Sequence, residues 1–246
     1  MSTSDQATAQ LEELLSAAAS DGTRQHWDRY LKGTAQFRGT PMGAVRAAVN
    51  QVWHGHGLRD EPLSRSLTLA QRWFTHAMTE DKLAAVLLIA EHLTSRLELR
   101  HADALAWPLE HGHISDWNVC DWYATKALHA FLTADKQSQR SRAEAVASWA
   151  NAPGLWQRRA AVVAFVKLAA TSPAPFDGFT DLVIEACAAN LVSSDRFAHT
   201  GPGWVLRELS RHEPDRVETF VREHPELSPE AVRMATARPA ATVAPR

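Results

Sequence analysis

The chain has 246 residues, of which 45% are hydrophobic and 22% charged, and its formal net charge is −2 with histidine neutral. This length suffices for one large domain or one repeat array with a substantial core, and the composition is typical of a globular protein. The near-neutral charge argues against a protein that binds nucleic acid mainly through net charge, although folding can still gather basic groups into one groove.

Features of membrane, secreted and metal-binding proteins are absent from the sequence. No run approaches the roughly 20 apolar residues of a membrane span, and the polar start MSTSDQATAQ does not resemble a secretory signal. Cys120 and Cys187 lie far apart in apolar patterns, which favours two buried thiols over a disulfide. There is no HExxH motif and no paired cysteine ligands. We therefore expect a cytoplasmic protein with neither a metal site nor a cofactor.

Apolar residues recur at three- and four-residue spacing almost throughout, which predicts helices and no convincing strand. In chain order, the clearest runs are 67–78, 81–93, 143–150, 156–170 and 179–192. Short segments rich in Pro and Gly separate them, and several place Ser or Thr before a Pro or an acid, which suits a helix N-terminus.

So many short helices favour stacked pairs over a closed bundle of a few long helices. We therefore predict an all-α fold, a HEAT-like α-solenoid of antiparallel helix pairs. It is expected to form a single domain over residues 1–237, followed by a flexible, Pro/Ala-rich tail at 238–246.

The stretch DWNVCDWY at 116–123 combines two acids with two tryptophans near a predicted helix start. Ser115 or Asp116 can cap a helix that runs to about Leu132. With about 100° per residue, its apolar face consists of Cys120, Ala124, Ala127, Leu128 and Phe131. The side expected to face water carries Asn118, Thr125 and His129.

Asp121 falls at the border of this apolar face, about 40° from Trp117. Two interpretations fit this placement. In the first, Trp117 packs in the core and Asp121 caps a neighbouring group. In the second, the carboxylate lies beside an aromatic wall, where low dielectric strengthens its field. Such a carboxylate can stabilise a developing positive charge or hold a water nucleophile.

Three other stretches repeat a combination of aromatic residues with arginine or glycine. RYLKGTAQFRGTPMGAVR at 29–46 predicts an aromatic helix, a Gly-Thr-Pro turn and a second helix. LWQRRAAVVAFVKL and the run that starts with GWVLRELSR each place Trp and Arg near a helix start. Structural interpretations are open here too, with Arg158 and Arg159 as surface charges and Trp204 as a core residue.

Taken together, these segments resemble the DNA alkylation repair family of HEAT-like, AlkD-type DNA glycosylases. The shared order is Y-x-x-G…F-x-G-x-P, then W-x-x-x-D, then W-x-x-R, then G-W-x-L-R-E, a P-x-x-V turn and an L-S-x-E-A-x-R ending. Each motif alone is weak, and the resemblance rests on their order across about residues 25–237.

The resemblance implies a monofunctional glycosylase of base excision repair. Its expected partner is duplex DNA that contains cationic N3- or N7-alkylated purines, with methyl or bulkier adducts. The family's curved solenoid holds DNA on a concave face and does not flip the damaged base into a pocket. The enzyme is expected to act as a monomer, without cofactor or membrane. Because a cationic purine leaves readily, catalysis must mainly stabilise an oxocarbenium-like sugar and place a water.

The resemblance also assigns roles to residues. Asp121 corresponds to the family's catalytic carboxylate, and Trp117 and Trp204 correspond to two indoles that pack on the lesion sugar. Arg159 corresponds to an arginine that holds the DNA backbone, and Tyr30 to a tyrosine on the same concave face. Two further candidates for DNA contact are Arg158 and Arg207.

Two departures from the family pattern leave other functions open. Asn118 stands where the family usually has an acid. Before Trp204, HTGPG replaces a helix that often carries Lys or Gln. Because Pro202 has no N–H, it is expected to start the helix and to put Trp204 beside an open groove, facing Trp117. The alternatives are a non-catalytic HEAT-like DNA-binding paralogue and a protein-interaction scaffold.

Overall fold

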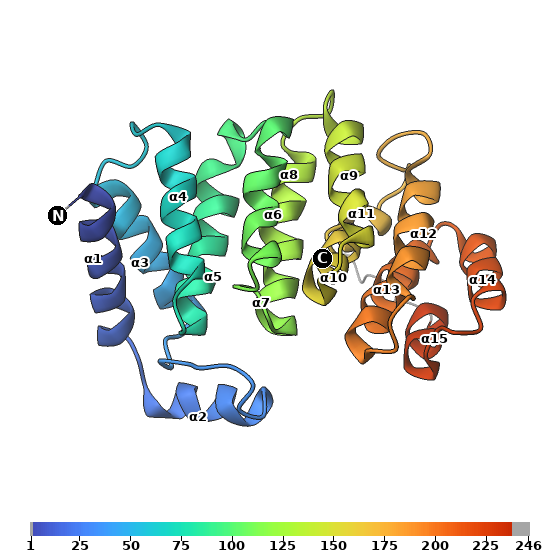
Figure 1. Cartoon of the computed structure of the whole chain (residues 1–246), viewed down its shortest axis with the longest axis horizontal. Helices are drawn as coiled ribbons and strands as arrows, with labels where there is room; N and C mark the ends of the chain where they lie inside the picture. Colours follow the sequence, from blue (N-terminus) through green and yellow to red (C-terminus); the bar gives the residue numbers. More distant parts are fainter. Residues whose placement is uncertain (1, 238–246) are drawn as a thin grey trace, which may run out of the picture. The chain divides into compact units, whose positions relative to one another are not determined.

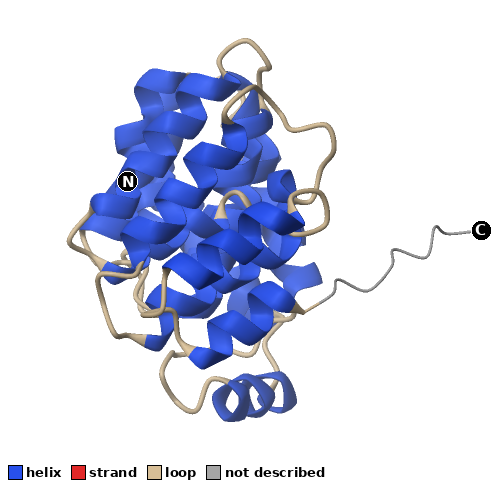
Figure 2. Ribbon diagram, turned by 90° about the vertical axis from the view of Figure 1, so that its right-hand side faces the viewer, coloured by secondary structure: helices blue, strands red, loops and turns tan. Residues whose placement is uncertain are grey.

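The computed structural model describes residues 2–237, and over this range the chain consists of helices and loops with no strand (Figures 1 and 2). The predicted all-α fold is therefore confirmed. The chain divides into two compact units, Met1–Ala134 and Asp135–Arg246, so a single domain over 1–237 stays a prediction. The predicted tail at 238–246 lies outside the described residues.

The first unit contains helices that stack in two layers. Their bounds are α1 Thr3–Ala17, α2 Asp21–Tyr30, α3 Met42–Gly55, α4 Leu63–Phe74, α5 Thr79–Leu87, α6 Ala102–Glu110, α7 Trp117–Trp122 and α8 His129–Thr133. In one layer α4 contacts both α1 and α6, and in the other α5 contacts both α3 and α7. Helix α2 runs crosswise to these helices (Figure 1). The repeated two-layer stacking is that of an α-solenoid.

Two helices of this unit continue into π-helical segments, whose turns are wider than those of an α-helix. The π-helical segment Leu88–Leu93 extends α5, and Tyr123–Leu128 joins α7 to α8. The ring of Tyr123 is fully buried, and its hydroxyl donates a 2.6 Å hydrogen bond to the Leu105 carbonyl of α6. Burial of the hydroxyl raises the pKa of Tyr123.

The second unit repeats the two-layer arrangement. Its helices are α9 Gln139–Ser148, α10 Leu155–Val163, α11 Val166–Ala169, α12 Phe179–Asn190, α13 Arg196–Leu209, α14 Pro214–Glu223 and α15 Pro229–Thr236. Helix α13 contacts both α10 and α15, and α12 contacts α9 in the second layer. The helices of both units agree with the predicted apolar runs. Among residues 2–237, no helix has the length and apolar character needed to cross a membrane.

Cys120 and Cys187 are both buried thiols, as the apolar pattern around them predicts. They belong to different helices, α7 and α12. Burial raises the pKa of the Cys187 thiol, so its reactive thiolate form is disfavoured.

The segment between α2 and α3 is held in place by one buried side chain, Glu80 of α5. Its carboxylate accepts three hydrogen bonds from backbone N–H groups, those of Arg38 at 3.0 Å, Gly39 at 2.7 Å and Thr40 at 3.0 Å. Gly39 has a φ of 95°, and a Cβ there would lie 2.2 Å from the Ser20 carbonyl oxygen. Only glycine therefore fits this position of the Gly-Thr-Pro turn.

A buried ion pair beside Glu80 ties the same segment to α5. The Arg38 guanidinium donates to both carboxylate oxygens of Asp81, at 2.7 and 3.0 Å. The Asp81 side chain is fully buried and that of Arg38 is 18% exposed. A carboxylate in this position is stable only while a positive group stays beside it.

Replacement of Arg38 by methionine should lower the free energy of unfolding by about 3 kcal/mol, because it leaves the Asp81 charge buried. Arg24→Met is the matched control, since Arg24 pairs with Asp21 at the surface and an exposed pair contributes less than about 1 kcal/mol. Urea denaturation followed by circular dichroism measures both. Equal, small losses would show that the buried pair does not stabilise the unit.

Candidate functional site

The helix that carries Trp117 and Asp121 begins as the sequence predicts. Of the two expected caps, Asp116 is the N-cap, and its side chain accepts a 3.0 Å hydrogen bond from the Val119 N–H. The helix runs through the π-helical segment to Thr133, close to the predicted end. The predicted apolar face is confirmed, because all of its members are fully buried: Cys120, Ala124, Ala127, Leu128 and Phe131. Trp117 and Asp121 are both half-buried.

Two of the predicted site residues contact each other in the first unit. The rings of Tyr30, at the end of α2, and Trp117, at the start of α7, lie edge to face with centroids 5.7 Å apart. Tyr30 is 57% exposed. Trp27 lies behind it, 5.8 Å from the Tyr30 ring and stacked on Phe37. Tyr30, Trp27 and Trp117 thus form an aromatic surface, of which Trp117 lies one helical turn from Asp121.

Asn118 does not face water, so this expectation was wrong. It is only 6% exposed and lines a small pocket with Trp27, Glu80 and Trp122. The residues between α2 and α3 cover this side of α7. Helical periodicity cannot show that cover, because it comes from a segment distant in sequence.

Lys82 of α5 contributes to the site, although its position in sequence does not reveal it. Its side-chain ammonium donates a 2.7 Å hydrogen bond to the main-chain carbonyl of His113, three residues before the Asp116 cap. Burial lowers the pKa of Lys82, and the charge of Asp116 partly opposes this effect. Burial raises the pKa of Asp116 above the usual aspartate range, while the Val119 N–H and the Lys82 charge act in the opposite direction.

Asp116→Asn should change the free energy of unfolding more favourably at neutral pH than in acid, compared with the wild type at the same pH. Since the pKa of Asp116 is raised in the folded state, the folded protein binds this proton more tightly than the unfolded chain. The wild type therefore loses stability as pH rises from the ordinary aspartate value through the raised one. Asparagine keeps a capping oxygen and has no charge to desolvate. Thermal unfolding of both proteins between acid and neutral pH tests this, and a pH-independent difference would contradict it.

In the second unit, Arg158 and Arg159 are buried, 8% and 5% exposed. Their interpretation as surface charges was therefore wrong. Arg158 donates to the carbonyls of Ala152 and Pro153, at 2.9 and 2.7 Å, and so closes the turn before α10. Arg159 donates to the carbonyl of Phe197 at 3.0 Å and to the hydroxyl of Thr200 at 3.1 Å. A DNA contact by either arginine would compete with these bonds.

Helix α13 does not begin at Pro202, which corrects the prediction. It starts at Arg196 with Asp195 as its N-cap and passes through Pro202, so Trp204 lies in the interior of the helix. A proline inside a helix leaves the carbonyl four residues earlier without its usual N–H donor. For Pro202 that carbonyl belongs to Ala198, and the Arg159 guanidinium binds the carbonyl of the preceding residue, Phe197.

Of the two glycines beside Pro202, Gly203 lets a neighbouring helix approach closely. A Cβ at Gly203 would lie 2.9 Å from both the Cα and the carbonyl oxygen of Ala231 in α15. At Gly201 it would lie 3.5 Å from the Arg159 guanidinium of α10. Gly203 thus serves helix packing, and the two glycines do not form a loop around Trp204.

Gly203→Ala should destabilise the protein by about 1–3 kcal/mol, because the added methyl group forces α13 and α15 apart. Gly43→Ala in α3 is the control. A Cβ there meets nothing within 4 Å, and alanine favours helix by up to about 1 kcal/mol. Chemical denaturation of the two variants should give shifts of opposite sign. A neutral Gly203→Ala would refute the close approach.

Trp204 and Arg207 are half-buried neighbours one turn apart on α13. The Arg207 guanidinium donates to Glu208 at 2.8 Å, and Glu208 also pairs with Arg211 at 3.0 Å. Trp204 is thus neither fully buried nor in a first turn. Its predicted position across from Trp117 joins residues of two different units and stays a prediction.

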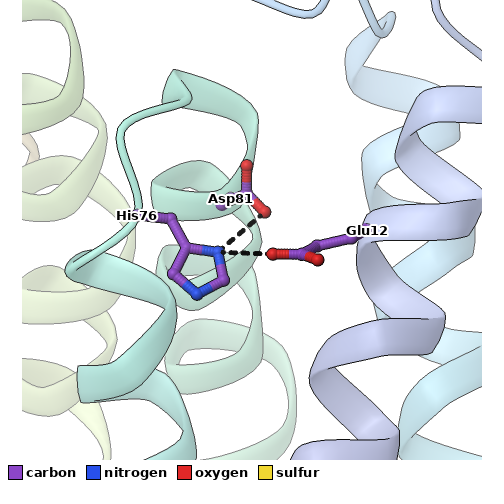
Figure 3. A group of neighbouring side chains, drawn as sticks. All are labelled: Glu12, His76 and Asp81. Atoms are coloured by element: carbon purple, nitrogen blue, oxygen red, sulfur yellow. Dashed lines mark hydrogen bonds and ion pairs between the residues drawn. The ribbon is translucent and has the colours of Figure 1, made fainter.

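Glu12, His76 and Asp81 form a separate group of possible metal ligands in the first unit (Figure 3). The His76 Nδ1 atom lies 3.2 Å from a Glu12 oxygen and 3.3 Å from an Asp81 oxygen. Because Asp81 already accepts two hydrogen bonds from Arg38, the group is satisfied as an ion-pair network. It connects α1 to the start of α5.

Comparisons with known proteins place this geometry in a family. A family model described as DNA alkylation repair enzyme matches residues 11–238. A solved structure described as a predicted DNA alkylation repair enzyme from Enterococcus faecalis superposes with a TM-score of 0.73 at 19% identity. The alignment covers 90% of this chain and 97% of that chain, which shows a shared fold. A search of curated proteins found no match. The chain belongs to the DNA alkylation repair enzyme family.

Proposed function

We propose that the protein is a monofunctional DNA glycosylase that hydrolyses the N-glycosidic bond of cationic N3- or N7-alkylpurines in duplex DNA. Family membership supports a role in alkylation repair. The observation that carries the specific proposal is the half-buried Asp121 one turn from Trp117, whose ring contacts the exposed Tyr30. We place the enzyme at cytoplasmic DNA, as a monomer in base excision repair.

The proposed chemistry needs one bond broken and one formed. The C1′–N bond breaks with its electron pair going to the purine, so the cationic base leaves as a neutral molecule. The sugar becomes an oxocarbenium ion, the oxygen of a water attacks C1′, and the proton that this water loses goes to the solvent. Asp121 stabilises the sugar cation and orients the water. The Trp117 ring adds a π-face that favours positive charge.

The electrostatic interaction between Asp121 and the sugar cation is strong enough to change the reaction rate substantially. Two unit charges about 4 Å apart interact by about 4 kcal/mol at an effective dielectric constant of about 20. A difference of this size between ground and transition states changes a rate by about 10³. Since the alkylated base already carries the charge that makes it a good leaving group, this contribution does not require protonation of the base.

DNA contact is proposed to involve both units. Tyr30 offers an exposed ring beside Trp117, and Trp204 and Arg207 share one side of α13. Arg159, bound to the Phe197 carbonyl in this structure, is proposed to approach the DNA backbone near the lesion. Arg158 is the weakest candidate, because its hydrogen bonds to the Ala152 and Pro153 carbonyls close a turn.

Asp121→Asn should keep the fold and DNA affinity and lower base excision by about 10²–10³. The change is nearly isosteric and removes only the charge. The measurement is single-turnover release of 7-methylguanine and 3-methyladenine from methylated duplex DNA. Asp60→Asn, at an exposed loop position of the same unit, is the matched control and should excise at the parent rate. Unchanged excision by Asp121→Asn would refute the catalytic assignment.

A non-catalytic DNA-binding role is the second candidate, favoured by the HTGPG segment before Trp204, which replaces a stretch that often carries Lys or Gln. The pairing of Arg207 and Arg211 with Glu208 reduces the free positive charge beside Trp204 and favours instead a protein scaffold. The same assay separates the two functions. A parent that releases no base but binds duplex DNA with a steep salt dependence supports the second candidate, and a parent that does neither supports a protein scaffold.

A further inference from the structure

We propose that Lys82 is a positioning residue of the site, holding the start of α7 so that Trp117 and Asp121 face the bound nucleotide. The inference rests on the proposed glycosylase function. It concerns an element outside the recognised motifs, because Lys82 lies on α5, in a sequence that reads as an ordinary helix start.

The loop before α7 is held at both ends, and Lys82 adds a side-chain hydrogen bond at the first of them. At the first end, the N–H groups of His113 and Ile114 both donate to the Pro108 carbonyl of α6, at 2.9 and 3.0 Å. At the other end, Asp116 caps α7. At the first end, in the peptide group that joins His113 to Ile114, the His113 carbonyl accepts the 2.7 Å hydrogen bond from the Lys82 ammonium.

Lys82 also balances the charge of the cap. Asp116 is only 8% exposed, and the charged groups that act on it are Lys82 from α5 and Asp121 from α7 itself. The His113 imidazole faces the Lys82 charge from the loop. Without Lys82, the buried Asp116 would have only the like charge of Asp121 beside it. Lys82 therefore offsets part of the cost of burying the Asp116 charge at this helix start.

A lysine that served packing alone would extend its ammonium into water and bury only its methylene groups. Lys82 is half-buried and directs its ammonium to a backbone carbonyl inside the unit. Desolvating this charge is unfavourable, and two groups offset that cost, the His113 carbonyl through its hydrogen bond and Asp116 through its charge. The arrangement connects α5 to the one helix turn that carries both Trp117 and Asp121.

The test compares Lys82→Met, which loses donor and charge, with Lys82→Arg, which keeps both. Lys136→Met, at an exposed loop position, is the control. Lys82→Met should slow single-turnover excision by about 10- to 100-fold, as expected for a displaced catalytic group, with affinity for undamaged DNA changed by less than about 2-fold. Lys82→Arg should recover most of the rate. If Lys82→Met fails to fold, Lys82→Gln, which keeps a donor without the charge, replaces it.

A readout independent of excision accompanies the rates. The Val119 amide, which donates to Asp116, should exchange its hydrogen at least about 10-fold faster in Lys82→Met than in the parent, because the first turn of α7 opens more often. Parent-like excision and parent-like exchange in a folded, uncharged variant would overturn the proposal, as would equal losses in Lys82→Arg. A parent without excision would remove the proposed function, and the exchange rates would still decide whether Lys82 holds the helix.

Discussion

The geometry of the first unit depends on the hydrogen bonds that the Glu80 carboxylate accepts. Buried inside the unit, this carboxylate accepts three backbone N–H groups of residues 38–40, where no water can replace it. Hydrogen bonds to an ionised acceptor are roughly twice as strong as neutral ones. They fix the segment that follows α2, and α2 carries Tyr30 to the Trp117 ring. The aromatic surface beside Asp121 thus depends on a carboxylate that belongs to a different helix.

Buried or half-buried charged side chains bind backbone groups at three other points of the chain. Arg158 closes the turn before α10, Arg159 binds a carbonyl of α13, and Lys82 binds the loop before α7. Each of these cations satisfies backbone carbonyls, which would otherwise be costly to bury. Fixed donors of this kind hold short helices in a defined orientation where each helix alone has little stability. The glycosylase mechanism that we propose needs such fixed positions, because electrostatic stabilisation of a transition state requires groups that are already in place.

Close backbone approach organises the second unit. Gly203 lies against the backbone of Ala231 in α15, with no room for a Cβ, and α13 also contacts α10, so α13 is packed on two sides. Pro202, directly before Gly203, removes one backbone donor and is accommodated inside the helix. The side of α13 that stays accessible carries Trp204 and Arg207. Packing on two sides therefore sets which residues remain available for a ligand.

The sequence by itself determined the all-α class, most helix positions, the Asp116 cap and the apolar face of the α7 helix, because helical period and capping chemistry are local properties. The order of its motifs also indicated the family. Only the tertiary structure decided which charged groups are buried. It put Asn118 under a distant segment, Arg159 against α13 and Lys82 beside Asp116, and it carried α13 through a proline. These outcomes depend on contacts between residues far apart in sequence, whose energies override local propensity and leave no periodic signal.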